Sequence, residues 1–184
     1  MIPNQNYDKK GHPKYLLAQN QQYFELLFAL LAKSSPALVE PVWELLQKLP
    51  VNAKLHQDIS SLQGAQEGWD SLLDSRSTHK LLYSLKIVEG LTAKASPQVN
   101  QQEDDSAQPE QLEAVEAENT HQAAWQKKFI ERGGFRHLLE TLAGLEIATI
   151  DSKLTLRCIE SLLGTILEFV QVEPALQDQI LALR

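Results

Sequence analysis

The chain has a single cysteine, Cys158, and this is the residue type best able to act as a nucleophile. A thiol protease places its cysteine on an exposed, polarised turn, with a histidine close enough to lower the pKa of the thiol. Cys158 instead lies in the stretch LTLRCIESLL, on the apolar stripe of a predicted helix, and no Gly- and Asn-rich box precedes it. The sequence therefore predicts a buried Cys158 that packs as a small hydrophobic residue, and it predicts no catalytic residue in this chain.

Histidines and glycines give no sign of a metal or cofactor site either. The five histidines are scattered: His12, His56, His79, His121 and His137. They form no paired motif, and no second cysteine stands at the spacing of zinc ligands. Gly133 and Gly134 follow a predicted helix rather than a strand, and no Lys-Ser or Lys-Thr pair comes after them, so they are not a phosphate-binding loop. We expect no metal and no cofactor.

Three tryptophans are candidates for protein binding, because tryptophan often carries much of the energy of an interface. Trp43 and Trp125 lie on apolar faces of predicted helices, where core packing is favoured. Trp69 stands between Gly68 and Asp70 in a break between helices, and there a core position and an exposed binding position are equally open. Trp69 is therefore the one candidate binding residue.

Helices must position these residues. The 184-residue chain has 43% hydrophobic residues and only eight Gly and eight Pro, and its Leu-rich stretches repeat at three- and four-residue spacing without alternation. This pattern predicts an all-α fold with one continuous core. Helices are expected at residues 13–33 and 36–49, after caps at Asn52 and Ser77, on both sides of Gly133-Gly134, and after Asp151 or Ser152.

Two of these helices have apolar residues on more than one face, and we expect each to have neighbours on more than one side. In residues 13–33 the apolar positions are Tyr23, Phe24, Leu26, Leu27, Phe28, Leu30 and Leu31. In the last long helix the predicted core stripe is Leu154, Cys158, Ile159, Leu162, Leu163, Ile166, Leu167 and Val170, with Leu156 and Phe169 beyond it.

Helix breakers suggest two further details. Pro41 should bend its helix or delay the start. The two glycines of SLQGAQEG should end the helix that begins after Asn52.

The formal charge of -7 is confined to one segment. Residues 96–120 contain seven acidic residues and no Lys or Arg, and the other 17 acids equal the 17 basic residues of the chain. The rest of the protein thus has no net field to attract nucleic acid or an anionic membrane, and neither is expected as a partner. Few large apolar groups interrupt this Gln-, Glu-, Ser- and Pro-rich segment, so we expect a disordered acidic loop. The alternative is an acidic docking peptide with Leu112 and Val115 on one helical turn.

The segment after the acidic loop has a more specific pattern. A short helix, a Gly-Gly-aromatic corner, a helix ending in LLETL and a long, widely apolar helix resemble one armadillo repeat. The expected fold is thus an armadillo/HEAT-like right-handed superhelical solenoid segment, in which neighbouring repeats complete each other's core. The expected organisation is a flexible segment at 1–12, helical repeats at 13–95, the acidic loop at 96–120, and an armadillo-like repeat at 121–184. Because the last residues, QDQILALR, form an uncapped amphipathic helix, we expect truncation there.

Several blocks also resemble a known family. PVWELLQKLP, then KLLYSL, then WQKKFIERGGFRHLLETL beyond an acidic insertion look like the non-catalytic helical region of large ubiquitin-specific proteases of the fat-facets type. The resemblance covers about residues 23–142. It implies an intracellular thiol protease that removes ubiquitin through a catalytic domain elsewhere in its chain.

Two functional hypotheses follow. The first is a scaffold segment of a large deubiquitinase that binds other proteins, ubiquitin among them, or positions substrates. The second is an independent armadillo adaptor outside the ubiquitin pathway, which the helical pattern alone allows equally well. One cysteine, no secretion signal and no apolar run long enough to cross a bilayer lead us to expect an intracellular protein, in the cytoplasm or also in the nucleus.

Overall fold

A computed structural model describes residues 13–33, 36–63, 65, 68–93, 109–145 and 153–181. Within these ranges the chain is helical and contains no strand, which confirms the all-α prediction. The helices are α1 (Pro13–Gln19), α2 (Gln21–Lys33), α3 (Pro36–Lys48), α4 (Ala53–Ser61), the 3₁₀ helix η3 (Trp69–Ser71), α5 (Thr78–Thr92), α6 (Pro109–Glu131), α7 (Gly134–Ala143), α8 (Lys153–Val172), the 3₁₀ helix η5 (Pro174–Leu176) and α9 (Gln177–Leu181). No helix among them has the length and apolar character needed to span a membrane.

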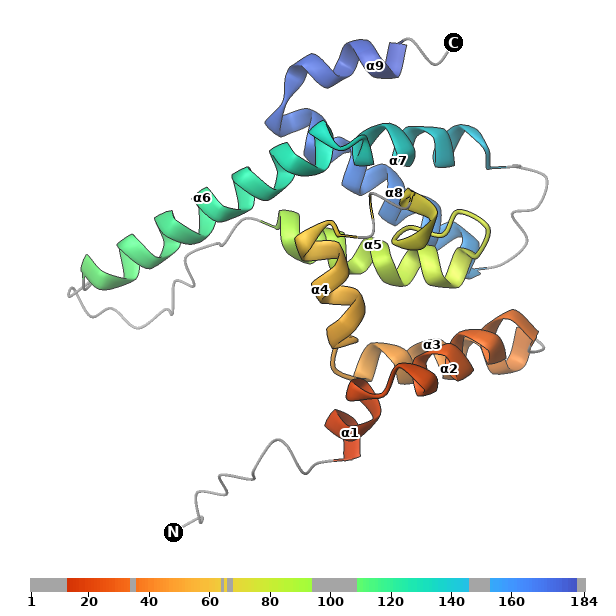
Figure 1. Cartoon of the computed structure of the whole chain (residues 1–184). Helices are drawn as coiled ribbons and strands as arrows, with labels where there is room; N and C mark the ends of the chain where they lie inside the picture. The colour runs from red at the N-terminus through yellow and green to blue at the C-terminus, as the bar shows by residue number, and fades with distance from the viewer. Residues whose placement is uncertain are drawn as a thin grey trace, which may run out of the picture.

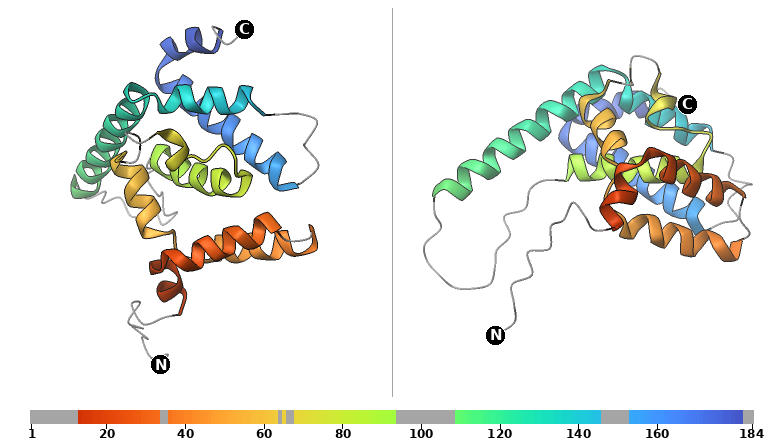
Figure 2. Two further views of the ribbon diagram at one scale, coloured as in Figure 1. Left: turned by 45° about the vertical axis from the view of Figure 1, so that its right-hand side comes forward. Right: turned by 60° about the horizontal axis from the view of Figure 1, so that its bottom comes forward.

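Helix α5 is the centre of the fold. The α2–α3 pair lies at one end of the molecule, and α4 leads from it to α5 (Figure 1). Helix α5 packs most extensively against α8 and also contacts α2, α4 and α6. All five side chains from Leu81 to Leu85 are buried, because neighbours surround this helix. Helix α7 packs on α8, and the first half of α6 projects away from the other helices in Figure 1 and in the right-hand view of Figure 2.

Two predicted N-caps are confirmed. The Asn52 side chain accepts a hydrogen bond from the Leu55 N–H at 2.8 Å and starts α4. The Ser77 hydroxyl accepts from the Lys80 N–H at 3.5 Å and starts α5. Each side chain satisfies a backbone donor that the first helical turn leaves without a partner.

The glycine corner is also confirmed. Gly133 adopts a left-handed conformation with φ of 82° between α6 and α7. Gly134 opens α7 directly against the ring of Phe129, so that a Cβ at position 134 would lie 2.7 Å from three ring carbons. Only glycine lets these two helices approach so closely.

The predicted helix at residues 13–33 is wrong in one respect, because it is two helices. Asn20 separates α1 from α2, and its side-chain oxygen accepts a hydrogen bond from the Gln22 N–H at 2.9 Å. Asparagine favours such local hydrogen bonds over a continuous helix. The buried face of α2 is also narrower than predicted, since Tyr23, Leu26 and Leu30 are exposed.

The proline in α3 and the glycines after α4 do not have the effects that the sequence predicted. Helix α3 starts at Pro36 and continues through Pro41, so its start is not delayed. Helix α4 ends at Leu62, which adopts a left-handed conformation with φ of 55°, two residues before the first glycine of SLQGAQEG. Leucine tolerates positive φ poorly. Leu62 nevertheless holds it, because its side chain is buried and its carbonyl accepts a hydrogen bond from the Arg132 guanidinium at 2.9 Å.

The predicted acidic loop is wrong for residues 109–120, which belong to α6. Pro109 occupies the first helical position, where its missing N–H costs nothing, and the Glu, Gln and Ala that follow are good helix formers. The side chains of Leu112 and Val115 lie outside the described part, as do residues 1–12 and 96–108.

The buried face of α8 differs from the predicted stripe. Leu163 and Leu167 are exposed, whereas Phe169 is completely buried. The side chains that face α5 and α7 include two polar residues, Ser161 and Thr165, both buried. They are tolerated because Ser161 donates to Glu89 and Thr165 donates to the Ser161 carbonyl. A helix that is apolar nearly all round does not reveal in its sequence which face has a neighbour.

The corner makes a first prediction about stability. Gly134→Ala should destabilise the fold by about 1 to 3 kcal/mol, because the new methyl group meets the buried ring of Phe129. Gly164→Ala in α8 meets no atom within 4 Å and should instead stabilise it by roughly 0.5 to 1 kcal/mol, the usual gain of Ala over Gly inside a helix. Urea unfolding of both variants measures the difference. Equal effects would show that the corner is not close-packed.

A second prediction compares neighbouring leucines on α8. Leu162 is 0% exposed and Leu163 is 43% exposed. Leu162→Ala should cost about 2 to 5 kcal/mol through the cavity that it leaves, and Leu163→Ala about 1 kcal/mol or less. Denaturant midpoints that rank the two variants in the opposite order would contradict the face assigned to α8.

Candidate protein-binding site

Trp69 lies half-buried at the α6–α7 corner. Its indole N–H donates to the Arg132 carbonyl at 2.9 Å. Its ring lies edge-on to Phe129, with centroids 4.9 Å apart, and stacks on His137 at 6.3 Å. Trp69 therefore packs against the core ring of Phe129 and is still partly exposed, and its role in binding a partner stays a prediction.

Two further groups anchor the segment after α4 to the same corner. The Arg132 guanidinium donates to the Leu62 carbonyl at 2.9 Å, and the His137 Nε2 atom lies 3.0 Å from the Leu73 carbonyl oxygen. Together with Trp69, these contacts hold the connection between α4 and α5 against the second half of the chain. The other two tryptophans, Trp43 and Trp125, are buried in the core as predicted.

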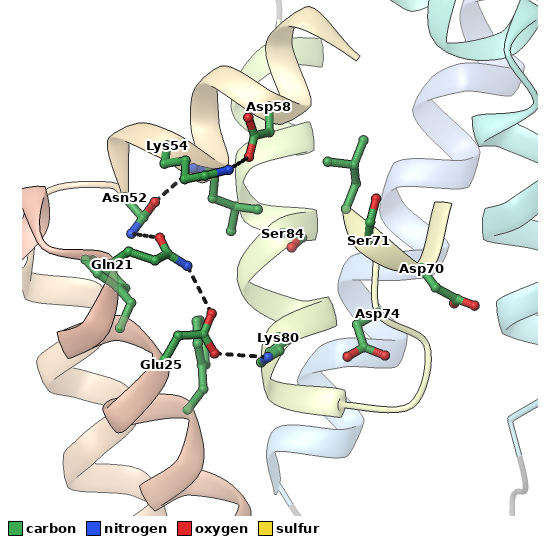
Figure 3. A pocket seen from close by; sticks show the side chains of 14 residues that line it. Gln21, Glu25, Asn52, Lys54, Asp58, Asp70, Ser71, Asp74, Lys80 and Ser84 are labelled. Carbon is green, nitrogen blue, oxygen red and sulfur yellow. Dashed lines mark hydrogen bonds and ion pairs between the residues drawn. The ribbon is translucent and has the colours of Figure 1, made fainter. Parts of the chain in front are cut away.

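A polar pocket of about 280 Å³ opens between α2, α4, η3 and α5 (Figure 3). Its side chains form a chain of hydrogen bonds that begins on α2. Gln21 donates to Glu25 at 3.0 Å and accepts from the Asn52 amide at 3.0 Å. The Asn52 backbone N–H donates to the Tyr83 hydroxyl at 3.0 Å. The pKa of Tyr83 is raised by burial, and the hydrogen bond from Asn52 partly opposes this effect.

Most charged groups of this pocket are paired within the protein, and Asp70 accepts a hydrogen bond from the Ser75 hydroxyl at 3.0 Å. Lys80 lies 3.2 Å from Glu25, Lys54 lies 2.6 Å from Asp58, and Asp74 pairs with Arg76 at 3.2 Å. The residues that line the pocket include no His or Cys. Its network ties α2 to α4 and α5, and it supplies no nucleophile and base arranged for catalysis. Nothing in the sequence pattern indicated the links between helices in this network, because the hydrogen bonds of Asn52 to Gln21 and Tyr83 each join residues 31 positions apart.

Cys158 is buried in α8, as predicted. Burial raises the pKa of its thiol to about 11, since the apolar surroundings disfavour the thiolate. A protease nucleophile requires the opposite shift.

The described histidines lie in different parts of the fold. Burial lowers the pKa of His79, and His137 contacts Leu73 and Trp69 as described above. Among the described residues, no cluster of His, Cys, Asp and Glu could hold a metal ion. His12 lies outside the described residues.

Two exposed apolar faces are the clearest surface features. On α2 the exposed residues are Tyr23, Leu26 and Leu30. On α8 they are Leu156, Leu163 and Leu167, which recur at the spacing of one helix face. Exposed apolar residues that share one helix face are candidates for protein–protein contact.

The environment of Cys158 predicts slow reaction with thiol reagents. With a pKa of about 11 and no access to solvent, the native thiol should react with iodoacetamide at least a hundredfold more slowly than in unfolding denaturant. The rate should rise steadily with pH and show no midpoint below pH 9. Fast alkylation of the native chain, half-maximal near pH 7, would instead reveal an activated nucleophile.

Comparison with known proteins gives one distant similarity. Over 108 residues, 54% of this chain, the sequence is 32% identical to human ubiquitin carboxyl-terminal hydrolase 34, and over 109 residues it is 35% identical to the mouse protein of the same name. The matched stretch is only 3% of either relative. No protein-family model and no solved structure matches the chain. The chain is therefore a helical segment that resembles a small part of a ubiquitin carboxyl-terminal hydrolase.

Proposed function

We propose that this chain is a non-catalytic scaffold segment of a large deubiquitinating enzyme, in which it binds other proteins or positions substrates for a catalytic domain elsewhere. The observation that carries the proposal is the similarity of half of the chain to ubiquitin carboxyl-terminal hydrolase 34. Ubiquitin itself is one candidate partner. The cytoplasm, and also the nucleus, is the proposed location.

The chemistry of the chain supports a binding role over an enzymatic one. Its single thiol is buried, with a raised pKa, and the polar pocket beside α5 holds ion pairs, one of which, Lys80–Glu25, links α5 to α2. Recognition of another protein requires accessible surface whose burial lowers the free energy, and it requires no activated nucleophile. The exposed faces of α2 and α8 meet that need.

The proposed architecture is an armadillo-like solenoid segment. The order α6, glycine corner, α7 and long α8 supports it, as does the packing of α7 on both α6 and α8. In a solenoid each repeat leaves apolar faces that its neighbours cover. The exposed residues of α2 and α8 are suited to such stacking.

An independent armadillo-type adaptor outside the ubiquitin pathway is the second candidate. It is favoured by the small extent of the similarity, which leaves nearly half of this chain unmatched. A protease domain in the same gene product would decide between the two.

The proposed function predicts a selective defect when the segment is removed from the longer enzyme. Hydrolysis of ubiquitin 7-amido-4-methylcoumarin should stay within about twofold of the intact enzyme, because its catalytic domain is elsewhere. Cleavage of ubiquitin from protein conjugates should fall about tenfold or more, because remote binding energy is lost. The isolated chain should hydrolyse neither substrate.

Two controls sharpen this experiment. Lys48→Ala, at an exposed position on α3 with a 3.7 Å surface ion pair to Glu44, should leave both activities unchanged. An equal loss of both activities on deletion would indicate a structural role in the catalytic domain. Hydrolysis by the isolated chain that Cys158→Ala abolishes would refute the non-catalytic assignment.

A further inference from the structure

One wall of a continuous groove is formed by a single face of α6. Asn119, Gln122, Ala123, Gln126 and Ile130 recur at three- and four-residue spacing and line three depressions in succession. The depressions measure about 730, 390 and 460 Å³. Neighbouring depressions share lining residues, so they are parts of one groove. From Asn119 to Ile130 this wall is roughly 17 Å long at 1.5 Å per residue.

The opposite wall comes from elements that follow much later in the sequence. The end of α8, then η5, then α9 face the stripe of α6 in turn, through residues such as Gln171, Val172, Leu176 and Gln179. In Figure 1, α8 and α9 lie near the end of α6 that meets α7. The groove shares no lining residue with the polar pocket of Figure 3, and its third depression reaches the glycine corner at Gly133.

The lining changes in character along the groove. The first depression has four carboxamides, Asn119, Gln122, Gln126 and Gln171, together with Glu168. The middle depression is lined by Ala123, Ile130, Val172, Ala175 and Leu176 beside its polar residues. A carboxamide offers one acceptor and two donors, which match the C=O and N–H groups of a peptide backbone.

Gln126 is the most informative of these residues. It is only 6% exposed, and its side chain makes no hydrogen bond with any other described residue. Its amide atoms are nevertheless accessible to solvent in the groove. Among the described residues, the side-chain polar atoms that are fully enclosed and lack a hydrogen-bond partner belong to Trp43 and Thr141, and Gln126 is not one of them. The Gln126 amide therefore offers an acceptor and two donors to a ligand in the groove.

The charges of the groove indicate the sign of its ligand. Lys127 lies 4.0 Å from Glu131, and Arg136 lies 2.8 Å from Glu140, so these four charges largely cancel. Two further carboxylates remain. Glu168 accepts only a hydroxyl hydrogen bond, from Thr92 at 2.6 Å, and Glu173 has no basic partner in the described part of the chain. Unpaired glutamates complement a basic ligand.

We propose that this groove binds an extended, basic peptide segment of a partner protein. Its backbone pairs with the carboxamides around Gln126, an apolar side chain fills the space beside Val172 and Leu176, and a Lys or Arg reaches Glu168 or Glu173. An extended chain fits better than a helix, because its backbone N–H and C=O groups are free to pair with carboxamides. About five residues span the groove at 3.3 Å per residue. This inference rests on the proposed protein-binding function and specifies the class of partner.

The test is selection of random hexapeptides, displayed on phage, against the full 184-residue chain. Selected sequences should combine an apolar residue with Lys or Arg. Their affinities, measured by fluorescence anisotropy, should weaken about tenfold in Gln126→Met, which keeps the shape but loses the hydrogen bonds. Glu168→Gln should reduce the salt dependence of binding while keeping an acceptor for Thr92. Gln57→Met, at an exposed position on α4, should have no effect.

A further variant guards against loss of folding at a buried site. Val172 is 46% exposed, so Val172→Glu should fold normally and still weaken peptide binding by placing a charge in the apolar section. Failure to enrich any peptide, enrichment of acidic peptides, or binding unaffected by Gln126→Met and Val172→Glu would overturn the proposal. A concentration-dependent dimer in ultracentrifugation, abolished by Val172→Glu, would overturn it in favour of a second copy of the chain.

The outcomes also separate this inference from the proposed function. If peptides bind in the groove but the enzyme cleaves conjugates equally well without the segment, the peptide-binding proposal holds and the scaffold role is refuted. If conjugate cleavage requires the segment but Val172→Glu does not affect it, the peptide-binding proposal is refuted and the scaffold role holds.

Discussion

The structure depends most on the contact between the backbone of Gly134 and the ring of Phe129. This contact lets α7 turn sharply away from α6, and the ring that allows it is completely buried. The same ring stacks on Phe169 of α8 at 4.9 Å and meets Trp69 edge-on. A single aromatic side chain thereby joins the corner, the last long helix and the connection between α4 and α5.

The halves of the chain are held together by polar contacts around this aromatic centre. The Trp125 indole reaches the Ile59 carbonyl at 3.3 Å, and the Arg132 guanidinium reaches the Leu62 carbonyl at the end of α4. Both carbonyls belong to the last turn of a helix, where intrahelical partners run out. The second half of the chain therefore completes the C-terminus of α4, which explains how a leucine keeps a left-handed conformation there. The frame so formed leaves Tyr23, Leu26 and Leu30 of α2 and Leu156, Leu163 and Leu167 of α8 exposed.

Sequence patterns predicted what local rules determine. The caps at Asn52 and Ser77, the left-handed Gly133 and the buried Cys158 each follow from a residue type and its immediate neighbours. The patterns failed where tertiary contacts decide. Leu163 and Phe169 occupy equally apolar positions in the sequence, and only the placement of α5 and α7 decides which of them is buried. Residues 109–120 combine a composition typical of loops with good helix formers, and no local rule decides between a loop and a helix there. The groove beside Gln126 requires α6 and α8 to meet, which no single segment reveals.

Native-state hydrogen exchange measures most directly whether the corner unites the chain into one frame. If the Phe129 cluster couples the halves as described, the slowest amides of α4, α5, α7 and α8 should exchange through one common opening, with the same free energy and the same denaturant dependence. They should also lose protection together when Gly134 is replaced by Ala. The account would be contradicted if the slow amides of α7 and α8 opened with a different free energy from those of α4 and α5. A loss of protection confined to α7 in Gly134→Ala would contradict it as well.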